Sequence, residues 1–270
     1  MADAHSDSFR HFWSSLAIVY GCMALERAIG AGRAFAFAAL LGRDGYGALA
    51  LAMSFIQMVL PAATLSIASA YSRYAPEYER RGAVKRFLAW SGGLSIGFAA
   101  AISLLVAWKA EWASEAIYGS AGQRVLVRLA ALALWLAAVH TIVIGGLRGM
   151  RLFGQAALAD LLKTALFTFG GAALILSFSP RRAEWALAGN ALGAGAAILV
   201  GGAALARAAG AARGGGDMES APAFFARLLR FSSAYVANSC MVAALLFASQ
   251  WMVNAFGSLA ETGLFGMAAQ

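Results

Sequence analysis

Charged side chains are scarce in this sequence: Asp, Glu, Lys and Arg make up only 13% of its 270 residues. A soluble globular domain carries about 25% charged residues, whereas here hydrophobic residues reach 61% and the mean hydropathy is +0.70. This leaves too little polar surface to cover a water-soluble fold. The sequence therefore predicts an all-α, polytopic membrane protein, because a single segment that crosses lipid must satisfy its own backbone groups.

Residues that carry chemistry are equally sparse. The only two cysteines, Cys22 and Cys240, both lie inside apolar runs, which excludes a disulfide framework. The sequence has no phosphate loop of the Walker type and no His/Cys metal cluster. We also expect no serine-nucleophile turn and no loop large enough to house a catalytic site. The expectation is a protein without catalytic residues, metal or cofactor, and not an enzyme.

Acidic residues are fewer than basic ones, 13 against 21, which gives a net charge of +8. In a membrane protein such an excess reports topology and contact with anionic lipid, and no nucleic-acid partner is expected. Twelve basic residues fall in the N-terminal segment and in the loops at 73–86, 148–151 and 207–230, against six at 43, 109–128 and 181–182. The positive-inside rule then predicts a multi-pass protein of the inner (cytoplasmic) membrane with its N-terminus in the cytoplasm.

Long apolar runs supply the spans. A bilayer crossing takes roughly 20 apolar residues, and about seven candidates occur: 13–41, 47–70, 84–108, 125–147, 157–178, 184–206 and 229–256. The mixed-charge, glycine-containing stretch 208–223 is the only real linker. We therefore expect a six-helix N-terminal lobe over 1–207, a cytoplasmic linker over 208–223, and the first helix and turn of an incomplete second lobe over 224–270. The pairs Gly93/Gly97, Gly145/Gly149 and Gly189/Gly193 predict close helix packing.

One glycine-rich stretch occurs twice. Residues 40–52 form a predicted polar turn between two apolar runs, and a fainter copy lies at 256–268, with Tyr46-Gly47 matching Thr262-Gly263. Self-similarity at this distance suggests a half-unit that begins twice. We expect the two copies to be related by an axis near the membrane normal.

Three charged residues interrupt the first span: Glu26, Arg27 and Arg33. A charge at the bilayer centre costs about 2.5–3.5 kcal/mol on insertion scales, so these side chains need partners or water. Glu26 and Arg33 share a helix face, and an ion pair of Glu26 with Arg33 or with a neighbouring helix is one interpretation. The other is a cationic cavity wall that binds an anionic ligand.

Other polar residues inside spans have two interpretations each. Asp160 and Lys163 could form an internal pair, with Lys163 either lining a pore or extending toward the interface. His140 could couple transport to protons, or form a hydrogen bond between helices. Four amides could contact a sugar headgroup or join helix to helix: Asn190, Asn238, Gln250 and Asn254.

Several loops resemble one family. The stretch 40–52 resembles the first-loop signature of polysaccharide flippases, and 70–78 is similar to their arginine-aromatic stretch. Further similar stretches are 146–153, 228–231 and 261–268. The family is the lipid-linked oligosaccharide (Wzx-type) branch of the multidrug/oligosaccharidyl-lipid/polysaccharide exporter superfamily. One departure lies at Thr64–Ile67, where the family usually has a glycine, and another is that the second lobe is nearly absent, as in a truncated member.

The resemblance implies two helical lobes around a central cavity, which carry a polyprenyl-diphosphate-linked oligosaccharide across the membrane by alternating access. On this hypothesis the substrate-binding residues are Arg27, Arg33, Lys163 and Asn190, and the ion-coupling residues, for H⁺ or Na⁺, are Glu26 and His140. The implied partners are membrane lipid and the glycosyltransferases and polymerase of a polysaccharide pathway. The alternatives are a cation-coupled multidrug exporter of the same fold and a non-transporting scaffold in a polysaccharide-export assembly.

Overall fold

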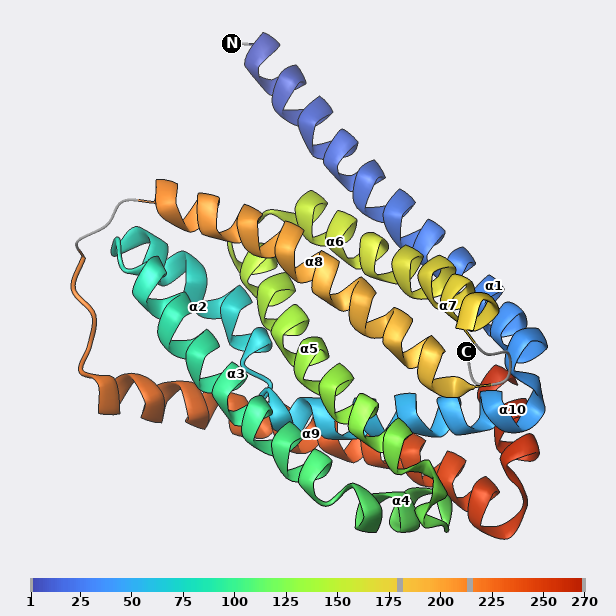
Figure 1. The fold of residues 1–270 in the computed structure, drawn as a ribbon. Helices are drawn as coiled ribbons and strands as arrows, with labels where there is room; N and C mark the ends of the chain where they lie inside the picture. Colours follow the sequence, from blue (N-terminus) through green and yellow to red (C-terminus); the bar gives the residue numbers. More distant parts are fainter. Residues whose placement is uncertain (1, 179–181, 213–215, 269–270) are drawn as a thin grey trace.

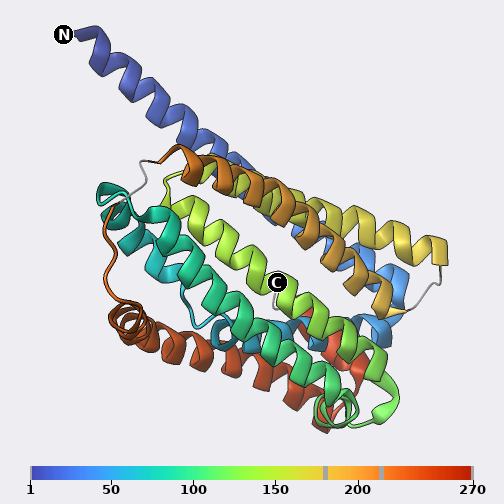
Figure 2. The ribbon, with the colours of Figure 1, turned by 60° about the vertical axis from the view of Figure 1, so that its left-hand side comes forward.

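The computed structural model of the chain describes residues 2–178, 182–212 and 216–268. Within these ranges the regular structure is helical and contains no strand. The long helices lie side by side in a bundle, from which the N-terminal half of the first helix extends (Figures 1 and 2). The predicted all-α class is confirmed.

Six helical stretches of the described residues are long and apolar enough to cross a membrane. The first, Ala17–Arg80, covers most of the first predicted span, 13–41, and the whole of the second, 47–70. The other five agree with the remaining predictions: Val84–Trp108, Ala121–Gly149, Phe153–Phe178, Ala183–Ala211 and Ala221–Phe256. The protein is therefore a multi-pass helical membrane protein.

Helix α1 (Ala2–Ala63) bends sharply at Gly42, where the chain turns back along the bundle (Figure 1). Gly42 has φ 73° and ψ 176°, a backbone conformation that glycine adopts without the steric cost of a Cβ. The helix resumes at Arg43. The sequence predicted a longer polar turn here that drew on three glycines, but one glycine makes the whole turn.

A second break separates α1 from α2 (Ala68–Arg80). Two consecutive non-glycine residues have positive φ there, Leu65 at 51° and Ser66 at 46°, and each costs of order 1–3 kcal/mol. Buried hydrogen bonds hold the turn, including Ser95 Oγ to the carbonyl of Thr64 at 2.9 Å. The second predicted span, 47–70, is thus interrupted and then continues as α2. This break lies at the position where the resembled family carries a glycine.

The remaining elements follow in chain order. They are α3 (Val84–Trp108), α4 (Ala110–Tyr118), η1 (Ala121–Gln123), α5 (Arg124–Gly149), α6 (Phe153–Ala165), η2 (Leu166–Gly170), α7 (Gly171–Phe178), α8 (Ala183–Ala211), α9 (Ala221–Phe256) and α10 (Leu259–Ala268). Helices α6 and α7 form one stretch through the π-helical turn η2. Helix α9 begins earlier than the predicted 229, and part of the predicted linker, 213–215, lies outside the described residues.

Small residues allow close packing at two of the three predicted glycine pairs. A Cβ added to Gly145 would lie 2.9 Å from the Cβ of Ala68, so α5 packs closely on α2. Likewise, a Cβ on Gly193 would lie 2.6 Å from the carbonyl oxygen of Lys163, so α8 packs closely on α6. At Gly93 and Gly97 nothing lies within 4 Å, and that pair makes no such contact.

The loops gather at two ends of the bundle (Figure 1). At one end the turn after α2 meets the linker, where the backbone N–H of Gly216 donates to the carbonyl of Gly82 at 3.4 Å. At the other end Trp251 Nε1 donates to the carbonyl of Ala116 at 3.0 Å, joining α9 to α4. The hydroxyl of Tyr118 donates to the carbonyl of Ala48 at 3.2 Å, and burial raises the pKa of Tyr118. Loops that the charge count assigned to opposite sides therefore lie at opposite ends.

The two copies of the repeated stretch contact each other reciprocally. A Cβ on Gly47 would overlap the carbonyl oxygen of Leu259, and a Cβ on Gly263 would lie 2.8 Å from the carbonyl oxygen of Arg43. The sequence alignment pairs Gly47 with Gly263 and, continued without a gap, Arg43 with Leu259. Each copy thus makes the contact that its counterpart makes, which is the pattern produced by a two-fold axis.

Equivalent residues also face each other across this contact. The amide nitrogen of Gly263 lies 3.2 Å from the Cβ position of Gly47, and the reverse distance is also 3.2 Å. One turn further on, a Cβ on Gly266 would lie 3.0 Å from the Cβ of Ala50, its own counterpart. Because counterparts meet at successive turns, the helices run parallel and in register, and the local two-fold axis runs along them.

Candidate functional site

The bend at Gly42 turns the two halves of α1 into two walls of a cavity of about 700 Å³. The wall before the bend supplies Glu26, Arg27 and Arg33, and the wall after it supplies Met53 and Gln57. The stretch formed by α6 and η2 contributes Thr164 and Phe167. All three charged residues that the sequence singled out in the first span therefore line one cavity.

The two arginines of this cavity have different surroundings. Arg27 is exposed, whereas Arg33 is partly buried and its guanidinium carbon lies 4.3 Å from the ring centroid of Phe167. Such a contact stabilises a cation by about 0.5–2 kcal/mol without neutralising its charge. The wall thus carries a guanidinium fixed by an aromatic face beside a second one that is free to move.

Glu26 interacts electrostatically with Arg33 across the cavity wall but makes no direct ion pair with either arginine within the described residues. It accepts a hydrogen bond from the hydroxyl of Thr164 at 3.2 Å. Among the described residues, no ion pair joins a carboxylate to Arg27 or Arg33. The local ion pair between Glu26 and Arg33 considered from the sequence is therefore not formed, and the cavity presents two cations and one carboxylate.

Lys163 and His140 belong to a different pocket, of about 480 Å³, between α2, α5 and α6. Asp160 lies between two partners there: Arg148 Nη2 is 2.9 Å from its carboxylate and His140 Nε2 is 3.4 Å from it. The expected pair of Asp160 with Lys163 does not form among the described residues. His140 Nε2 faces this carboxylate on the next helix, but within the described residues it forms no hydrogen bond, so the predicted interhelical hydrogen bond is not formed there.

Asn190 is buried away from the arginines. Its Nδ2 lies 3.9 Å from the sulfur of Met53, and it is not among the residues that line the cavity. The structure therefore brings Glu26, Arg27 and Arg33 into one cavity lining. Lys163 lines the neighbouring pocket but lies close enough to Glu26 and Arg33 to interact with them electrostatically, and Asn190 touches the cavity through Met53. Sequence reasoning missed Gln57, Thr164 and Phe167 as lining residues. Gln57 alone had a usable signal, since it is an amide inside an apolar run.

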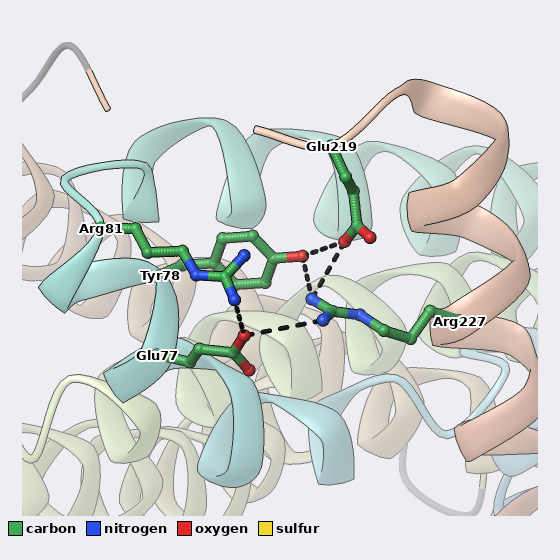
Figure 3. Close-up of polar contacts among 5 residues, drawn as sticks. All are labelled: Glu77, Tyr78, Arg81, Glu219 and Arg227. Carbon is green, nitrogen blue, oxygen red and sulfur yellow. Dashed lines mark hydrogen bonds and ion pairs between the residues drawn. The ribbon is translucent and has the colours of Figure 1, made fainter. Parts of the chain in front are cut away.

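A separate polar cluster joins α2 to the linker and α9 at the arginine-rich end (Figure 3). The guanidinium of Arg227 lies 3.6 Å from the carboxylate of Glu77 and 3.0 Å from that of Glu219, and it donates to the hydroxyl of Tyr78. Tyr78 in turn donates to Glu219, and Arg81 pairs with Glu77, both at 2.5 Å. These contacts tie the start of α9 to the end of α2.

The comparison with protein families covers nearly the whole chain. The family model described as polysaccharide biosynthesis protein matches residues 13–270. The chain belongs to this family. No curated protein and no solved structure matches it. The chain is therefore a multi-pass membrane protein of polysaccharide biosynthesis, as the resemblance of its loops indicated.

The sequence does contain the residue pattern of a serine-nucleophile turn, contrary to one expectation. Residues 93–97 of this family member spell Gly-Leu-Ser-Ile-Gly, the pattern of a serine-nucleophile turn. That chemistry requires a strained strand-to-helix turn, but here the serine, Ser95, lies in the middle of α3. Its buried hydroxyl donates to the carbonyl of Thr64. Its role in the structure is to hold the turn that precedes α2.

Proposed function

We propose that this protein binds a polyprenyl-diphosphate-linked oligosaccharide and moves it across the cytoplasmic membrane. The observation that carries the proposal is the cavity wall with Arg27 and Arg33, two cations that form no direct ion pair with a carboxylate among the described residues. A diphosphate cannot enter hydrocarbon without groups that replace its water. Guanidinium groups do this well because they donate paired hydrogen bonds to phosphate oxygens.

The division of labour follows from the positions of the two arginines. Arg33, fixed above Phe167, would hold the diphosphate at a constant place, and the exposed Arg27 would close on it. The polyprenyl chain would remain in the lipid throughout, so moving it needs no binding site on the protein. Glu26, bonded to Thr164 on α6, is the acidic candidate for coupling to H⁺ or Na⁺.

We propose further that residues 1–207 form the first lobe and residues 224–270 the start of the second lobe. Residues 208–223 would link the two on the cytoplasmic side of the membrane. The reciprocal contact of residues 43–50 with 259–266 supports two related halves. A cationic wall disfavours the multidrug alternative, because many substrates of such exporters are themselves cations.

The first test measures binding of a labelled polyprenyl diphosphate oligosaccharide to the purified protein. Arg27→Ala and Arg33→Ala should each weaken binding roughly ten- to a hundredfold, the effect of losing about 1.5–3 kcal/mol of hydrogen bonding to a charged group. The lysine variants should retain part of the affinity because they keep the charge. Arg128→Ala, which removes an exposed arginine of α5 outside the cavity, is the control.

Undiminished binding by the double variant Arg27→Ala/Arg33→Ala would contradict the proposal. Movement is measured separately, as the loss of label from the outer leaflet of proteoliposomes. Binding without movement would favour the non-transporting scaffold over the flippase.

A further inference from the structure

A second, uncharged pocket adjoins the arginine-lined cavity. It has a volume of about 290 Å³ and lies between the second half of α1 and helix α9. Its polar lining consists of Ser54, Gln57, Asn238 and Ser239, and the rest is aliphatic. This volume lies near the lower end of the range for small-molecule pockets, about 300–1,000 Å³.

The lining matches the hydrogen bonding of sugars. An amide side chain offers two donors and a carbonyl acceptor, and a serine hydroxyl both donates and accepts. Sugar hydroxyls also do both, so they can be satisfied from either side. No charged side chain lines the pocket. A phosphate group there could therefore accept hydrogen bonds only from uncharged donors.

The amides of this pocket are the ones that helix packing does not use. Gln250 accepts from Ser54 at 2.5 Å and Asn254 donates to the carbonyl of Ile117 at 3.4 Å, so both join helices. Gln57 and Asn238 are exposed, and within the described residues neither amide has a hydrogen-bond partner. An unbonded amide facing lipid is costly, which favours a ligand or water opposite these two side chains.

Gln57 lines both this pocket and the cavity that holds Arg27 and Arg33. A ligand whose anionic group meets the arginines would therefore extend its next group past Gln57 toward Asn238. We propose that the pocket of Ser54, Gln57, Asn238 and Ser239 binds the first neutral sugars of the lipid-linked oligosaccharide. This inference rests on the proposed function and adds to it a recognition site for the glycan.

The test compares two probes on the purified protein: a short-chain polyprenyl diphosphate without sugar, and the same lipid carrying a neutral disaccharide. The wild-type protein should bind the sugar-bearing probe roughly tenfold more tightly, the effect of one or two hydrogen bonds. Asn238→Leu, which lies outside the arginine-lined cavity, should reduce this ratio to near unity while leaving affinity for the bare lipid diphosphate unchanged. Gln57→Leu, at the position that the two pockets share, should also lower the ratio.

Asn254→Leu makes the same substitution on α9 outside the pocket and should keep the wild-type ratio. Ser239→Ala, a smaller change, should lower the ratio in part if the leucine variants do not fold. An unchanged ratio in the variants, or equal binding of both probes by the wild type, would overturn this inference while leaving the proposed function intact. Failure of the wild-type protein to bind either probe would overturn both.

Discussion

At the scale of single residues, the cavity depends on how one cation is held. Arg33 is fixed by the ring of Phe167, and Glu26 by the hydroxyl of Thr164, so the two charges share a helix face without pairing. Breaking a buried ion pair would leave one charge uncompensated and cost about 3–5 kcal/mol. Losing a cation–π contact costs about 0.5–2 kcal/mol. The loss of stability on mutation therefore distinguishes an ion pair between Glu26 and Arg33 from separate contacts with Thr164 and Phe167.

A double-mutant cycle on Glu26→Gln and Arg33→Gln should therefore show little coupling. Each single change is expected to lower the stability by about 0.5–2 kcal/mol, and the two effects should add within about 0.5 kcal/mol. The measurement is thermal unfolding in detergent. A double variant as stable as the wild type, after two strongly destabilised singles, would instead reveal the ion pair.

Sequence reasoning found part of the cavity for a clear physical reason. Charges are expensive inside a span, so Glu26, Arg27 and Arg33 stand out from the surrounding apolar residues. Phe167 has no such contrast, because it is one of 17 phenylalanines in an apolar chain. Which one lies over Arg33 is decided by the packing of η2 against α1. Lys163 stands out as strongly as the arginines, yet it faces another pocket.

At the scale of elements, hydropathy predicts the parts of helices that lie in hydrocarbon and misses their polar continuations. The prediction of 84–108 coincides with α3. The charged stretch of α2 that follows residue 70 was not predicted by hydropathy; only the resemblance of 70–78 to a family motif that closes the second helix pointed to it. Glycine marks one bend and not the other. Gly42 is visible in the sequence, whereas the turn at Leu65 and Ser66 has no glycine: it follows Pro61 and is held by hydrogen bonds to the carbonyl of Pro61 and by one from Ser95.

The contact between α1 and α10 predicts a specific cross-link. In a background with Cys22→Ala and Cys240→Ala, the pair Ala50→Cys and Gly266→Cys should form a disulfide, because their Cβ positions lie 3.0 Å apart and need only slight separation. Mass spectrometry after alkylation of free thiols reads the result. The control pair is Ala50→Cys with the exposed Leu264→Cys. Full alkylation of the first pair after oxidation would contradict the parallel, in-register contact.

At the scale of the whole molecule, the bundle has an arginine-rich end and an arginine-poor end. The cluster around Arg227 lies at the first, where the end of α2, the linker and the start of α9 meet (Figure 3). Helix α4 lies at the second, against the end of α9. This separation agrees with the count of basic residues in the loops. That count could be made from the sequence alone, because it requires only the order of the spans along the chain.

Reporter fusions test the orientation of these ends. Fusions at 82 and 216 should be active as cytoplasmic reporters, and fusions at 119 and 257 should be active outside, because basic loops are retained in the cytoplasm. The positions 82 and 216 serve as mutual controls, since their backbones contact each other. Opposite activities at these two positions, or a reversed pattern overall, would contradict the proposed topology.

The parallel contact of Gly47 and Ala50 with Gly263 and Gly266 has a consequence for ancestry and assembly. A surface that meets its own equivalent across a two-fold axis is the surface by which two identical subunits form a symmetric dimer. This protein contains that geometry within one polypeptide, as a gene duplication and fusion of such a dimer would leave it. Residues 259–266 thus take the position that the equivalent residues of a second subunit would take in such a dimer.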